Sequence, residues 1–133
     1  MDTTDTHEVA IPVITDNLGK YLLITRTEYP EHKGQWGPIA GHVKRGETIE
    51  QALIRESLEE LNLQVKPIKQ IARIDQDIAG DVGVWWACDI LGGNIKTNEE
   101  IEKVEFFSAE EIRGLDLWPA TKKFFEEFVW KKN

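Results

Sequence analysis

The sequence predicts a mixed α/β sandwich in which strands and helices share one core. Strand-like apolar runs and helix-start signals follow one another irregularly, which argues against a regular β-α-β repeat. No internal repeat or linker-like run divides the chain. The chain has 133 residues, enough for one hydrophobic core. We therefore expect a single domain over residues 1–133.

The first strands are predicted in the N-terminal third of the chain. Two apolar runs, EVAIPVIT (8–15) and KYLLIT (20–25), are joined by the turn-forming sequence DNLG, which predicts a β-hairpin. The segment EYPEHKGQWGP (28–38) is rich in glycine and proline and predicts a loop. A short strand is expected at residues 39–43.

A helix is predicted from Ile49 to Leu61. Thr48 and Gln51 fit a capping box, in which the threonine side chain caps the helix and the glutamine reaches back to it. Asn62 stands where the helix should end, and asparagine tolerates the left-handed conformation of a C-terminal cap.

Three more strands and two more helices are expected in the C-terminal half. The strand-like runs are residues 65–76, 81–90 and 103–108. A second capping box, Ser108 to Glu111, opens a short helix that Gly114 should stop. Pro119 favours a first turn and should open the last helix, over residues 120–132. Its apolar stripe should pack in the core and consists of Phe124, Phe125, Phe128 and Val129.

Composition restricts the classes of function. With 41% hydrophobic and 30% charged residues the chain is typical of a soluble globular protein. A net charge of −8 argues against a nucleic-acid partner, which needs a basic face. It leaves room for a small phosphorylated substrate, because divalent cations can invert a local field.

Location and oligomeric state are less constrained. No apolar run approaches a bilayer span, so no membrane partner is expected. The N-terminus MDTTDTHEV is acidic, unlike a secretory signal. Cys88 is the only cysteine, which excludes an internal disulfide. We expect a cytoplasmic protein and leave the oligomeric state open, a homodimer included.

Three carboxylates on the first helix need an explanation. Glu56, Glu59 and Glu60 stand three and four residues apart, where like charges repel. They span roughly 100° of arc, next to a broad apolar arc. The residues of that apolar arc, which we expect to bury against the sheet, are Ile49, Leu53, Ile54, Leu58 and Leu61. The helix alone fits either a solvated acidic face or a site for a hard divalent cation.

The preceding loop favours the cation site. Gly41 and Gly46 bracket a tight turn, and Glu47 can pair with Arg55. The stretch GHVKRGETIEQALIRESLEELNL (41–63) resembles the signature of the Nudix hydrolase family. The residues that match this signature are Gly41, Glu47, Arg55, Glu56, Glu59, Glu60 and Leu63. Two positions depart from it: Asn62 replaces a glycine, and Ser57 replaces an aliphatic residue.

The resemblance implies a fold, a reaction and a metal. It implies a Nudix-type α/β/α sandwich with a mixed β-sheet, and Mg²⁺- or Mn²⁺-dependent cleavage of a diphosphate linkage in a nucleotide. The implied metal ligands are Glu56, Glu59, Glu60 and the carbonyl of Ala40. By the same resemblance, Glu47 and Arg55 orient the loop and helix.

The general base is left open. Glu56 is one candidate. The other lies in NEEIEKVEFF, where Glu100 is our choice and Glu102 the reserve, although a solvated acidic loop explains either one equally well.

Substrate contacts are proposed from charge and aromatic character. Arg26 could meet a phosphate or form a surface ion pair. Trp36, Trp85 and Trp86 could stack on a base or fill the core, and Trp85 and Trp86 should face opposite sides of their strand. His42 has no matching role.

The first hypothesis for function is a diphosphatase acting on nucleoside triphosphates or related derivatives. A nucleotide-sugar or dinucleoside polyphosphate hydrolase is the alternative. A non-catalytic, ligand-sensing Nudix-like domain is disfavoured because the metal carboxylates are all present.

Overall fold

The predicted α/β sandwich is confirmed. The computed structural model describes residues 5–131. Its strands are β1 (Asp5–Thr15), β2 (Tyr21–Arg26), β3 (Gly41–Lys44), β4 (Leu63–Asp75), β5 (Val82–Gly93) and β6 (Ile101–Phe107). Its helices are the 3₁₀ turn η1 (Pro30–His32), α1 (Ile49–Leu61), α2 (Ala109–Ile112) and α3 (Pro119–Phe128).

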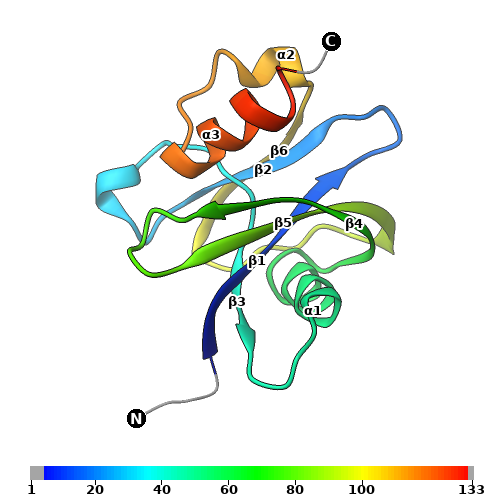
Figure 1. The fold of residues 1–133 in the computed structure, drawn as a ribbon. Helices are drawn as coiled ribbons and strands as arrows, with labels where there is room; N and C mark the ends of the chain where they lie inside the picture. The colour runs from blue at the N-terminus through cyan, green and yellow to red at the C-terminus, as the bar shows by residue number, and fades with distance from the viewer. Residues whose placement is uncertain (1–4, 132–133) are drawn as a thin grey trace.

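The six strands form one mixed sheet. Its order is β4-β5-β1-β2-β6, and β3 pairs with β1. β1 runs parallel to β5 and antiparallel to β2 and β3. Figure 1 shows α1 on one side of the sheet and α2 with α3 on the other. The α/β/α layering follows from this arrangement.

Two hydrophobic clusters hold the layers together, one on each face of the sheet. β1 supplies both, because its alternate residues point to opposite faces: Ala10 and Ile14 join the α1 side, and Ile11 joins the α3 side. Trp85 belongs to the α3 cluster and Trp86 packs against the α1 cluster. The expectation that these two indoles face opposite ways is confirmed.

α1 begins and ends where the sequence predicts. Both hydrogen bonds of the Thr48–Gln51 capping box form, and Asn62 closes the helix in the left-handed conformation at φ 56°. The predicted buried arc is partly wrong, since Ile54 and Leu58 are 43% and 49% exposed. The helix contacts the sheet through a narrower stripe, made up of Ala52, Leu53, Ser57 and Leu61 with Ile49 partly buried.

Several other boundaries differ from expectation. α3 ends at Phe128, so the predicted helix is too long, and its last residue, Lys132, lies outside the described residues. In its apolar stripe Phe124 and Phe125 are buried, whereas Phe128 and Val129 are half-buried. β1 starts three residues earlier than predicted, at Asp5.

β3 is Gly41–Lys44 and not residues 39–43, because only these residues pair with β1. Within residues 5–131, no helix has the length and apolar character needed to cross a membrane.

Candidate functional site

A cavity of about 590 Å³ opens between the C-terminal half of α1, the start of β3 and the N-terminus of α3. It gathers most of the residues predicted for metal, base or substrate roles. Those that line it are Arg26, Ala40, Glu56, Glu59, Glu60, Trp85 and Glu100. Segments far apart in sequence therefore meet on one concave surface, as expected of a ligand site.

Gly41 positions the Glu56 carboxylate. A Cβ atom at Gly41 would collide with the carboxylate carbon and oxygens of Glu56. Glycine is required there for close approach, and the carboxylate lies against the backbone of β3. Burial raises the pKa of Glu56, and the hydrogen bond from Arg55 opposes that rise.

Arg55 anchors the loop before α1 to the helix. Its Nε and Nη2 donate to the two oxygens of Glu47 at 2.7 and 2.9 Å, and Nη2 also donates to the carbonyl oxygen of His42 at 3.1 Å. The Nη1 group donates to Glu56 at 2.7 Å and to Glu59 at 3.0 Å. The predicted Glu47–Arg55 pair is present. It stands behind the cavity and does not line it.

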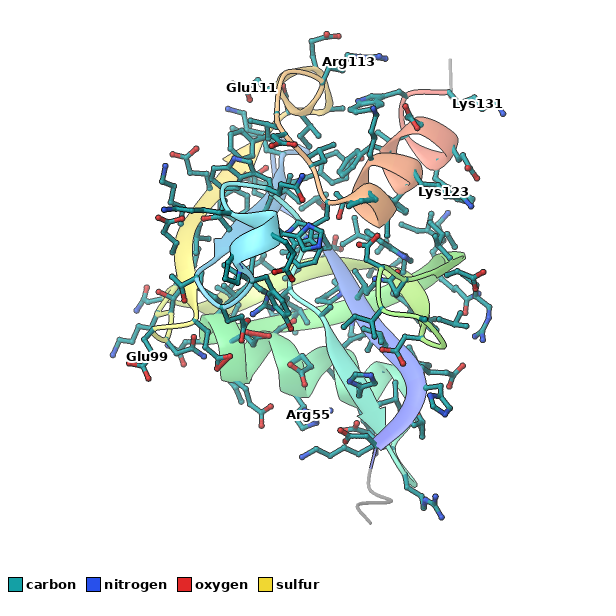
Figure 2. The ribbon with its side chains drawn as sticks, turned by 90° about the vertical axis from the view of Figure 1, so that its left-hand side faces the viewer. Arg55, Glu99, Glu111, Arg113, Lys123 and Lys131 are labelled. Atoms are coloured by element: carbon teal, nitrogen blue, oxygen red, sulfur yellow. The ribbon has the colours of Figure 1, made fainter. Side chains whose placement is uncertain are left out.

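The pairing shifts the pKa of both Glu47 and Arg55 away from their ordinary values. The hydrogen bond from Arg55 lowers the pKa of Glu47, and Glu47 and Glu56 raise that of Arg55 despite burial. In Figure 2, Arg55 lies by α1, well away from Lys123 of α3.

A second arginine balances the remaining glutamate. Arg26, at the end of β2, donates to Glu60 at 3.1 Å and to Glu28 at 3.0 Å. Its side chain is 14% exposed and that of Glu60 is 15% exposed. Burial alone would lower the pKa of Arg26, but Glu60 and Glu28 raise it. The nearby carboxylate of Glu28 disfavours a second negative charge and so raises the pKa of Glu100.

The donor set on this wall suits a hard divalent cation. Carboxylate oxygens and a backbone carbonyl are the ligands that Mg²⁺ and Mn²⁺ prefer. Among residues 5–131, however, no three acidic, histidine or cysteine side chains are drawn together as a metal cage. Arg55 and Arg26 hold the carboxylates, so a cation would compete with guanidinium groups for the same oxygens.

Of the two tryptophans predicted to contact substrate, Trp85 lines the cavity and Trp36 does not. The Trp36 ring meets Phe107 edge-on at 4.9 Å in the α3 cluster. The Trp85 indole is 1% exposed and stacks on Phe124 at 4.4 Å.

Several lining residues were not predicted. Trp118, Tyr29 and His32 form an aromatic group in which Trp118 stacks on His32 at 3.9 Å and meets Tyr29 edge-on. Gln76 and Asp77, from the turn after β4, complete that end. The only sequence signal was Trp118 directly before Pro119, at the start of a helix.

His42 also lines the cavity. Its Nε2 lies 2.9 Å from Oδ2 of Asp81, a buried residue at the start of β5. The pair ties β3 to the turn between β4 and β5, so His42 has a structural contact that the sequence did not reveal.

Comparison with known proteins identifies the family and agrees with the fold. The NUDIX domain family model matches residues 5–128. The chain is 32% identical to an ADP-ribose pyrophosphatase of Methanocaldococcus jannaschii, over 94% of this chain and 75% of that protein. It is 32% identical to the oxidized purine nucleoside triphosphate hydrolase of Mus musculus, over 75% and 66% respectively. It is 31% identical to the nucleoside triphosphatase NudI of an Enterobacter species, over 90% and 94%.

Solved structures repeat the architecture. The solution structure of the E. coli ORF135 protein aligns with a TM-score of 0.75 at 27% identity, over 92% of this chain and 87% of that one. The MutT protein of Methanosarcina mazei aligns with a TM-score of 0.76 at 23% identity, over 93% of each chain, and supports the fold alone.

Proposed function

This chain belongs to the Nudix hydrolase family and is a diphosphatase that cleaves nucleotide pyrophosphate bonds. We propose that it hydrolyses nucleoside triphosphates to the nucleoside monophosphate and pyrophosphate. Mg²⁺ or Mn²⁺ would be the cofactor, in keeping with the divalent-metal dependence typical of the family.

One observation carries the choice of a triphosphate. The stacked aromatic group of Tyr29, His32 and Trp118 lies at the α3 end of the cavity, and the α1 wall is made of carboxylates and Arg26. A nucleoside triphosphate has one ring system at one end and phosphates at the other. A dinucleoside polyphosphate, which has a nucleobase at both ends, would need a second aromatic or apolar wall.

The metal ligands are proposed by position. Glu56, Glu59, Glu60 and the carbonyl of Ala40 would hold the cation, which when bound neutralises phosphate charge and acidifies a water molecule. Gly41 holds Glu56 in place by leaving room for its carboxylate. Arg26 shares hydrogen bonds with Glu60, so a cation that takes up Glu60 would free the guanidinium for a phosphate oxygen.

In the proposed reaction a water oxygen forms a bond to phosphorus as the anhydride P–O bond breaks. The water proton passes to a general base, and the electron pair of the broken α–β anhydride bond stays with the bridging oxygen of the departing product. Glu100 suits the base better than Glu102, because Glu100 lines the cavity and Glu102 accepts a hydrogen bond from Thr25 outside it. Glu56 is the other candidate.

Two relatives favour different substrates, which makes the assay a comparison. The M. jannaschii protein is described as an ADP-ribose pyrophosphatase, and the Enterobacter protein as a nucleoside triphosphatase. A nucleotide panel should be assayed with Mg²⁺, with products separated by chromatography. We expect kcat/KM for the best triphosphate to exceed that for ADP-ribose by at least about tenfold.

Two controls define the outcome. EDTA should abolish turnover and added Mg²⁺ should restore it. The Glu59→Gln variant, purified in the same way, should lose about a hundredfold in rate, which excludes a contaminating phosphatase. A preference for ADP-ribose, or turnover that survives thorough metal removal, would contradict the proposal.

A further inference from the structure

The end of the cavity farthest from α1 carries polar groups that the proposed chemistry does not use. Gln76 and Asp77 follow β4 and line the cavity beside the N-terminus of α3. Trp118, which precedes that helix, lines it too, with one face of its indole stacked on His32. A nucleobase bound there would lie near an aromatic ring with polar side chains at its edge.

Asp77 is held in place by the start of α3. Asp77 remains partly exposed, and the backbone N–H of Ala120 and the side chain of His32 lie close enough to its carboxylate to lower its pKa. Burial raises the pKa of Asp77, and these two contacts oppose the rise. A carboxylate has about four lone-pair sites on its two oxygens, so the Ala120 hydrogen bond leaves acceptor capacity on both.

The Gln76 amide lies over β5. A Cβ atom at Gly83 would collide with Oε1 of Gln76, so glycine is what allows this position. The Oε1 atom is buried and has no hydrogen-bond partner among residues 5–131. Because Oε1 is turned against β5, the amide NH₂ is the end that remains for a ligand. The indole Nε1 of Trp85, also without a partner there, lies in the same wall.

Gln76 and Asp77 are adjacent in the chain, and between them they offer the cavity one donor group and two acceptor oxygens. The Gln76 amide donates, and the two oxygens of Asp77 accept. Guanine presents the complementary edge: O6 accepts, and N1–H and the 2-amino group donate side by side. Adenine, cytosine and uracil each place an acceptor next to every donor on that edge, so a carboxylate can accept only one hydrogen bond from them.

We propose that Asp77, with Gln76 beside it, selects a guanine-type base, one that carries a 6-oxo and a 2-amino group. This inference rests on the proposed function for the identity of the substrate as a nucleotide. Asp77 is assigned the two donors of the base, N1–H and the 2-amino group, and Gln76 the 6-oxo oxygen.

Asp77 also has a structural use, and the test must separate the two. Trp118 gives α3 no side-chain cap, so the Asp77 contact with Ala120 serves in that role. Asn in place of Asp keeps an oxygen that can accept from Ala120, but it offers a base only one acceptor. Asp77→Asn should therefore fold normally and lose discrimination.

The experiment compares GTP with ITP, which lacks only the 2-amino group. We expect wild-type kcat/KM for GTP to exceed that for ITP by about 10- to 100-fold, the range for losing a hydrogen bond to a charged partner. In Asp77→Asn this ratio should fall to about threefold or less. The matched control is Asp75→Asn, an exposed aspartate on β4 outside the cavity lining, which should keep the wild-type ratio.

A binding measurement separates this inference from the proposed function. GMP and IMP can be titrated against tryptophan fluorescence, which requires no hydrolysis. If no triphosphate is hydrolysed but GMP binds at least about tenfold tighter than IMP, the proposed function fails and the role of Asp77 stands. Equal wild-type kcat/KM for GTP and ITP, or equal affinity for GMP and IMP, overturns the inference about Asp77. So does an unchanged GTP-to-ITP ratio in Asp77→Asn.

Discussion

Replacing Arg55 with alanine should destabilise the fold and weaken metal binding together. The guanidinium is 21% exposed and donates to Glu47 through two nitrogens, and the Glu47 side chain is 14% exposed. Removing one partner of a buried pair costs about 3–5 kcal/mol, and partial exposure places this site near the lower end, about 3 kcal/mol. For a chain of this length that corresponds to a fall in Tm of about 10 °C.

The coupling of Glu47 to Arg55 is measured by a double-mutant cycle. Glu47→Gln keeps one acceptor and loses the charge, which should cost about 1–2 kcal/mol. The double variant should be little less stable than Arg55→Ala, leaving a coupling energy of about 1–2 kcal/mol. Thermal unfolding and a Mg²⁺ titration are the two measurements. Arg55→Lys should recover little, because an ammonium cannot reproduce the planar fork.

The matched control is the Arg73–Glu8 pair. Its N–O distance is 2.9 Å, but the side chains are 49% and 41% exposed. Its coupling energy should be below about 0.5 kcal/mol, as for other solvent-exposed pairs. If the Arg55–Glu47 cycle is strictly additive, or resembles the Arg73–Glu8 cycle, the assignment of this pair as the anchor of the loop is refuted.

The same pair should make stability depend on pH. Arg55 lowers the pKa of Glu47, so the pair stabilises the fold fully above the unfolded-state pKa of about 4.3. That stabilisation is lost as the pH falls through the lower, folded-state pKa. The Tm difference between wild type and Glu47→Gln should therefore be largest at pH 7 and shrink toward pH 3. A constant difference would mean that the Glu47 charge does not contribute.

Three further substitutions and one chemical modification distinguish roles within the structure. Glu59→Gln and Glu60→Gln should each lower kcat by roughly a hundredfold. Only Glu60→Gln should lower Tm by several degrees, since Glu60 has a largely buried contact with Arg26 and Glu59 is 56% exposed. Equal Tm values for the two variants would count against the Arg26 contact. Gly41→Ala should displace Glu56 and lower kcat by a similar, roughly hundredfold, factor. Unchanged kinetics in that variant would show that the close approach is dispensable. Burial, aided by Asp89, raises the pKa of Cys88 to about 12, so iodoacetamide at pH 8 should modify it at least about a hundredfold faster in the urea-unfolded chain than in the native one; comparable rates would contradict its burial.

The boundaries of α1 could be predicted because local interactions decide them. The Thr48–Gln51 capping box and the left-handed cap at Asn62 involve residues within a few positions of one another. The end of α3 was predicted less well, since no comparable cap marks it and the apolar pattern continues past Phe128. The direction in which β1 and β5 pair was not predicted, because it depends on how the chain crosses the sheet.

The buried face of α1 shows the limit of counting hydrophobic residues. Ile54 and Leu58 were expected to pack on the sheet and are exposed, whereas Ser57 is 0% exposed. Periodicity gives the spacing of a buried stripe, but the angle at which the helix rests on the sheet decides which stripe is buried. That angle depends on β1, β3 and β4, with which α1 is in contact.

The signature residues were the part of the site that the sequence by itself determined. Gly41 opens β3, Glu47 lies in the loop that follows, and Arg55 and the three glutamates lie on α1, so their mutual positions follow from one continuous segment. The structure alone decided which groups complete the cavity. Trp118 and Asp77 are distant in sequence and meet only because α3 packs against the end of β4. The separation of Trp118 and Asp77 along the chain does not predict that they lie close together, because the packing of α3 on the sheet depends on the whole core.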